Sequence, residues 1–105
     1  MSAVAEEVTL ALPAESLALV RALLRQHAPE ARFFAFGSRV VGDQAGLARV
    51  KPHSDLDLAF TGDPLPLETL FALRDAFSQS DLPMRVDIAQ ACDLPPTWQI
   101  LTWHF

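Results

Sequence analysis

The chain has few of the features that stabilise secreted proteins or anchor proteins in membranes. Its 105 residues include a single cysteine, Cys92, so no internal disulfide can form, which favours a reducing cytoplasm. No apolar run approaches the roughly 20 residues that a membrane-spanning helix needs. The first residues also lack the basic and apolar pattern of a signal peptide. We therefore expect a cytoplasmic protein with no membrane partner.

Positive charge is scarce as well. Eight lysines and arginines face 13 aspartates and glutamates, which gives a net charge of −5. This balance argues against a protein that grips long nucleic acid through its phosphates. It is compatible with binding a small nucleotide, because cations close to a site can oppose the total charge. The length and the composition, half of it hydrophobic, predict a single domain over residues 1–105.

The spacing of apolar residues predicts helices and strands in alternation. The predicted elements are a weak strand over 8–12, helices over 13–27 and 67–78, strands over 32–36, 55–60 and 84–89, and a short final helix after Pro95 and Pro96. The final helix would carry Trp98, Leu101 and Phe105. The segment from Arg39 to Ser54 is expected to be a polar loop. This order predicts an α/β (α+β) fold, with a small mixed β-sheet flanked by helices.

Two aspartates mark the strand predicted over 55–60. Side chains alternate along a strand, so Asp55 and Asp57 should share one face while Leu56, Leu58 and Phe60 enter the core. Adjacent carboxylates repel each other unless a cation lies between them. A hard divalent ion such as Mg²⁺ prefers oxygen ligands and relieves that repulsion. The pair therefore predicts a metal site.

A glycine turn follows the strand predicted over 32–36. Phe34 and Phe36 are predicted to pack inward, and Gly37-Ser38 should end the strand in a turn whose backbone can approach a ligand closely. Backbone N–H groups in such a turn, with the Ser38 hydroxyl, can hold phosphate oxygens. Phosphate donors next to metal-binding carboxylates indicate nucleotide chemistry.

These residues carry a family resemblance. The matching segments are Gly37-Ser38-Arg39, Gly42, Ser54-Asp55-Leu56-Asp57-Leu58 and Val86-Asp87-Ile88. They resemble the signature of the DNA polymerase beta-like nucleotidyltransferases, and above all of the minimal nucleotidyltransferases (MNT domains), over residues 14–105. MNT domains are short chains often paired with HEPN-domain proteins in toxin–antitoxin modules. One feature departs from the pattern, since sixteen residues lie between Ser38 and Asp55 and residues 46–50 look inserted.

The resemblance implies a metal-dependent transferase of the polymerase beta-like fold. It would move a nucleoside monophosphate, AMP from ATP, to a hydroxyl acceptor. Asp55, Asp57 and Asp87 would be catalytic and would hold two Mg²⁺ ions, with Mn²⁺ as an alternative, and ionised Asp87 could take the proton of the acceptor. The nucleotide-binding residues would be Gly37, Ser38 and Arg39, with Arg39 neutralising the charge that grows on pyrophosphate. His53 is not assigned as a ligand, because a loop histidine more often hydrogen-bonds within its own turn.

The acceptor and the partner stay open between three alternatives. By resemblance, the acceptor is a tyrosine of a HEPN toxin, which would make the chain an antitoxin. A small molecule could be nucleotidylated instead, although a chain this short has little room for a second substrate domain. A non-catalytic antitoxin could also act by binding alone. Trp98 and Trp103 are candidate anchors of a protein interface, and a homo-oligomer is compatible with the sequence.

Overall fold

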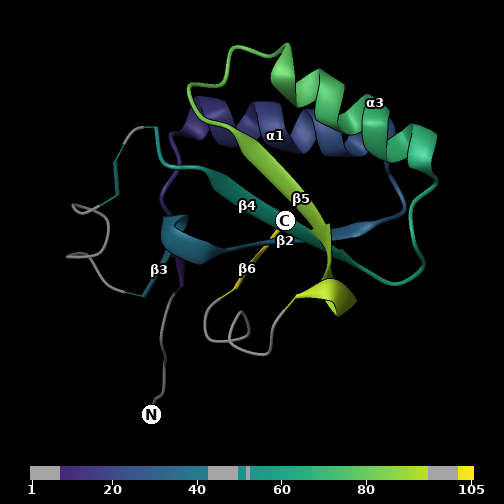
Figure 1. Cartoon of the computed structure of the whole chain (residues 1–105). Coiled ribbons are helices and arrows are strands. Elements are labelled where there is room, and N and C mark those ends of the chain that lie inside the picture. Colours follow the sequence, from purple (N-terminus) through teal and green to yellow (C-terminus); the bar gives the residue numbers. More distant parts are fainter. Residues whose placement is uncertain (1–7, 43–49, 52, 95–101) are drawn as a thin grey trace.

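The computed structural model describes residues 8–42, 50–51, 53–94 and 102–105. Its centre is a four-stranded sheet in the order β5-β4-β2-β6, and a two-stranded sheet pairs β1 with β3. The strands are β1 (Thr9–Leu10), β2 (Arg32–Phe36), β3 (Val40–Val41), β4 (Leu56–Thr61), β5 (Val86–Gln90) and β6 (Trp103–His104). Helices α1 (Ala14–His27) and α3 (Leu67–Ser78) lie side by side over one face of the larger sheet (Figure 1). The predicted α+β class with a mixed sheet is confirmed.

The pairing of the strands brings the two predicted motifs together. Strand β2 runs antiparallel to β4, and β4 runs parallel to β5, with α3 as the crossover connection that a parallel pair requires. In this register Phe36 lies opposite Asp57, and Asp57 lies opposite Asp87. The end of β2 and the beginnings of β4 and β5 therefore meet at one place in the sheet.

The core lies between the helices and one face of the sheet. Each of its members exposes less than a tenth of its surface. The main ones are Val20, Leu24, Phe33, Ala35, Leu56, Leu58, Phe60, Leu73, Phe77 and Ile88. Leu56, Leu58 and Phe60 thus enter the core as predicted. Phe34 and Phe36, which were predicted to pack inward, do not join this core cluster. Because side chains alternate, both lie on the opposite face from Phe33 and Ala35, where Phe34 is buried and Phe36 is half-buried.

Most predicted elements match the structure closely. Both long helices and the strand over 32–36 are confirmed, and the other two strands begin one or two residues later than predicted, at Leu56 and Val86. As a result Asp55 lies just before β4. Residues 40–41, predicted as part of the polar loop, form β3, which pairs with β1. The inserted-looking segment falls largely within residues 43–49, outside the described residues.

The prediction of a final helix was wrong for the last residues of the chain. Residues 95–101, including Trp98 and Leu101, lie outside the described residues, but Trp103 and His104 form the edge strand β6, which pairs with β2. Thr102-Trp103-His104-Phe105 alternates polar and aromatic side chains, which is the two-residue period of a strand. Pairing with the apolar strand β2 satisfies backbone groups that a helix would have satisfied within itself. No helix in the described residues is long and apolar enough to cross a membrane.

Candidate active site

The glycine turn touches the central carboxylate. After β2 the chain turns through the short 3-10 helix Gly37–Arg39, and Gly37 has a positive φ of 84°. A Cβ atom added to Gly37 would lie 2.5 Å from Oδ2 of Asp57, closer than any side chain can approach. Only glycine fits here, both because of its φ and because of this contact. The backbone of the turn therefore lies directly against the Asp57 carboxylate, and the exposed Ser38 follows it.

Three carboxylates lie around this turn. Asp57 is half-buried in β4, Asp87 occupies the neighbouring position in β5, and Asp55 precedes β4 by one residue. Neighbouring strands are about 4.8 Å apart, so the backbones hold Asp57 and Asp87 close together. Asp55 and Asp87 are exposed to solvent. The structure therefore brings the three predicted acidic residues to one edge of the Gly37 turn.

The arrangement of the three carboxylates affects the protonation of Asp57. Its pKa is raised above the ordinary value of an aspartate, first by burial of the carboxyl group and then by the negative charges of Asp87 and Asp55. Within the described residues, no group of three His, Cys, Asp or Glu side chains is drawn in closely enough to hold a metal ion as it stands. The three aspartates thus form a group of carboxylates whose negative charge a nearby cation would stabilise.

Arg39 lies inside the protein rather than at the surface of the turn. Its side chain is only 3% exposed, and burial lowers the pKa of the guanidinium. Nε donates to the Ser54 carbonyl oxygen at 2.8 Å, one terminal nitrogen to the Ala11 oxygen at 2.6 Å, and the other to the Lys51 oxygen at 3.3 Å. The backbone N–H of Ala11 also donates to the Arg39 oxygen at 2.6 Å. Arg39 therefore joins the segment after β1 to the segment that leads into Asp55.

His53 makes a connection that the sequence did not reveal. Its Nδ1 lies 2.9 Å from the carbonyl oxygen of Pro83, thirty residues away, instead of bonding within its own turn. A carbonyl oxygen can only accept, so Nδ1 carries the proton. The backbone N–H of Leu56 also donates to the Arg85 oxygen at 2.8 Å. These two bonds fasten the segment that carries Asp55 to the segment that leads into Asp87.

A mixed sheet covered on one face by two helices, with a glycine turn against a strand carboxylate, is consistent with a small α+β nucleotidyltransferase fold. No protein-family model matches the chain. Over 80 residues it is 44% identical to a protein of Haemophilus influenzae named "Probable protein adenylyltransferase MntA". The matched segment is 75% of this chain but 65% of that relative, so the chain spans slightly less than two thirds of its length. This similarity supports the resemblance to the minimal nucleotidyltransferases that the sequence motifs indicate.

Proposed function

We propose that this protein is a metal-dependent nucleotidyltransferase that moves AMP from ATP to a hydroxyl acceptor. The observation that carries the proposal is the contact between the Gly37 turn and Asp57, next to Asp87 on the adjoining strand. It sets backbone groups able to bind phosphate against carboxylates able to bind metal. The printed name of the Haemophilus influenzae relative, a protein adenylyltransferase, supports the adenylyl group as the one transferred.

The residues present fit divalent metal ions. Asp55, Asp57 and Asp87 offer only oxygen ligands, which Mg²⁺ and Mn²⁺ prefer. Burial raises the pKa of Asp57, and the negative charges of Asp87 and Asp55 raise it further. Asp55 and Asp87 are exposed, so their side chains can rotate toward Asp57. Two bound ions would neutralise the charge on the phosphates and on the oxygens that attack and leave.

The chain's own groups divide the remaining tasks. The N–H groups of the Gly37-Ser38 turn and the Ser38 hydroxyl bind the β- and γ-phosphates and hold the α-phosphorus in line with the acceptor. Ionised Asp87, on the exposed side of the site, takes the proton of the acceptor hydroxyl. For Arg39, whose predicted phosphate contact stays a prediction, we propose a positioning role. By binding the Ser54 carbonyl it fixes the segment that presents Asp55.

The acceptor is proposed to be a tyrosine of a HEPN toxin, whose modification would make this chain an antitoxin. These 105 residues contain no tyrosine, so a tyrosine acceptor would lie outside them. The relative's name, which specifies a protein adenylyltransferase, points the same way.

Mass spectrometry of the co-purified partner tests the proposal. Incubation with ATP and Mg²⁺ should add AMP to a partner tyrosine, and Asp55→Asn should abolish the addition while the two proteins still bind. A partner that is neutralised without modification would favour an antitoxin that acts by contact alone. Absence of any binding partner, with AMP transfer to a small hydroxyl compound, would favour a small-molecule acceptor.

A further inference from the structure

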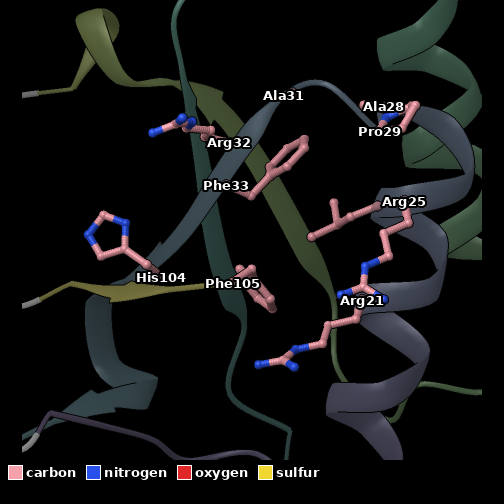
Figure 2. Close-up of a pocket in the computed structure, with 10 residues that line it drawn as sticks. Arg21, Arg25, Ala28, Pro29, Ala31, Arg32, Phe33, His104 and Phe105 are labelled. Carbon is pink, nitrogen blue, oxygen red and sulfur yellow. The ribbon is translucent and has the colours of Figure 1, made fainter.

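A cavity of about 420 Å³ lies at the opposite end of β2 from the carboxylates, between the C-terminal half of α1 and the end of β6 (Figure 2). Leu24, Phe33 and Phe105 give it apolar walls. Phe33 lies opposite Phe60 on β4, whereas Phe36 lies opposite Asp57. The separation of three residue steps corresponds to roughly 10 Å along the strand. The cavity is therefore separate from the proposed active site.

Two arginines of α1 stand at this cavity. Arg21 and Arg25 are one helical turn apart, are both exposed, and reach from the helix toward Phe105 (Figure 2). In the part of the chain that the structure describes, neither guanidinium forms an ion pair with a carboxylate. Arg21 instead lies over the ring of Trp103, with Cζ 5.5 Å from the ring centroid. Like charges at this spacing repel, and an anion between them would remove the repulsion.

The helix dipole stabilises the charge of only one of these arginines. Arg25 lies in the last turn of α1, where a cation is favoured by the partial negative charge of the helix end. Arg21 lies a turn earlier and gains little from that effect. Together the two full charges outweigh the roughly half charge of the helix end, so the mouth of the cavity is positive. In a chain with a net charge of −5, this is a local reversal of sign.

We propose that this cavity binds a small molecule that contains both a planar aromatic ring and a phosphate group, such as a nucleoside monophosphate or an aryl phosphate. Guanidinium groups match phosphate oxygens with paired hydrogen bonds, and two of them balance a phosphate dianion. The ring lies against Phe33 and Phe105, since aromatic walls favour a flat apolar surface. Small-molecule sites usually enclose about 300–1,000 Å³, and this cavity falls within that range.

The proposal does not rest on the transferase activity, and its test avoids that activity. NMR titration of the ¹⁵N-labelled protein with AMP, phenyl phosphate, inorganic phosphate and adenosine is done in EDTA, so that no divalent ion assists binding at the carboxylates. AMP or phenyl phosphate should shift the signals of Arg21, Arg25 and Phe105 and leave Gly37 and Ser38 unchanged. Binding of AMP alone would identify a nucleotide site, and binding of both would identify a site for aryl phosphates in general.

Three variants with the same loss of charge make the test specific. Arg21→Gln and Arg25→Gln should each weaken binding about tenfold or more, since each removes a charge-assisted hydrogen bond. Arg32 also borders the cavity, but its side chain points away on the other side of the strands (Figure 2), so Arg32→Gln should change affinity by less than about twofold at physiological salt. Equal losses in all three variants, shifts confined to the Gly37 turn, or equally tight binding of inorganic phosphate would overturn the proposal.

Discussion

Like charges lie close together near both ends of β2, but different elements carry them. At the Phe36 end, Asp57 and Asp87 project from neighbouring strands whose hydrogen bonds fix the distance between their backbones. The pKa of Asp57 is raised first by burial and then by the charges of Asp87 and Asp55. At the Arg32 end, Arg21 and Arg25 project from a helix on long side chains exposed to solvent. The backbones that carry the two carboxylates cannot move apart, whereas the long arginine side chains can. Repulsion between the strand carboxylates would therefore favour a bound cation, and the arginines on the helix could adjust to the shape of a ligand.

The largest effect should come from removing the central fixed charge. Asp57→Asn keeps the size of the side chain but removes the negative charge on which metal binding depends. We expect AMP transfer to fall about a thousandfold, of the order seen when one electrostatic group of an active site is lost. Asp63→Asn, in the exposed turn after β4, is the matched control and should keep full activity. Activity within tenfold of wild type in Asp57→Asn would remove Asp57 from the site.

Gly37→Ala tests whether the turn must lie against Asp57. The new Cβ would collide with Oδ2 of Asp57, so activity should fall about a hundredfold, as for a small misplacement of reacting groups. Gly62 also has a positive φ, 92°, but a Cβ there would meet nothing within 4 Å. Both variants should lose about 1 kcal/mol of unfolding free energy in urea. Equal activities in Gly37→Ala and Gly62→Ala would show that the close contact has no catalytic role.

Arg39→Met separates the structural task of Arg39 from the predicted phosphate contact. The variant leaves the carbonyl oxygens of Ala11, Lys51 and Ser54 without this donor. We expect the free energy of unfolding to drop by about 2–4 kcal/mol, measured by urea denaturation. The exposed Arg32→Met should change it by less than about 0.5 kcal/mol. A stable Arg39→Met protein whose only defect is a raised KM for ATP would instead support the phosphate contact.

The smallest expected effect is on how the stability of the protein depends on pH. The folded-state pKa of Asp57 is raised, so the folded protein binds this proton more tightly than the unfolded chain does. Its contribution to stability is therefore lost as pH rises from the ordinary aspartate pKa of 3.8 through the raised value. At pH 7 without metal, Asp57→Asn should melt roughly 2–4 °C above wild type, a modest gain because the carboxylate is partly solvated. Calorimetry showing wild type to be the more stable at pH 7 would contradict this sign.

The features predictable from sequence were those with a local signal. Helices α1 and α3 follow from apolar residues at helical spacing, and β2 and β4 from short apolar runs next to turn residues. Asp55, Asp57 and the glycine turn were identified from the pattern along two predicted strands, and Asp87 was identified from the family resemblance. The register that sets Asp57 beside Asp87 agrees with that expectation. Their roles in catalysis remain predictions.

The features that sequence did not predict depend on distant contacts. The side chain of Arg39 follows a turn that indicates phosphate binding, but its bonds go to carbonyls 28, 15 and 12 residues away. The bond of His53 to Pro83 likewise joins two loops with no shared pattern. Strand β6 is two residues long and forms because β2 offers it an edge. Such contacts come from tertiary structure, which overrides local preference in short segments.

The most direct measurement compares ATP labelled on the α-phosphorus with ATP labelled on the γ-phosphorus. Each is incubated with Mg²⁺, this protein and its co-purified acceptor, and the label on the acceptor is counted. Transfer of AMP predicts that the α-label is incorporated and the γ-label is released as pyrophosphate, with both signals lost in Asp57→Asn. Incorporation of the γ-label would mean phosphoryl transfer, and an acceptor that binds without taking up either label would mean that the carboxylate site is not catalytic.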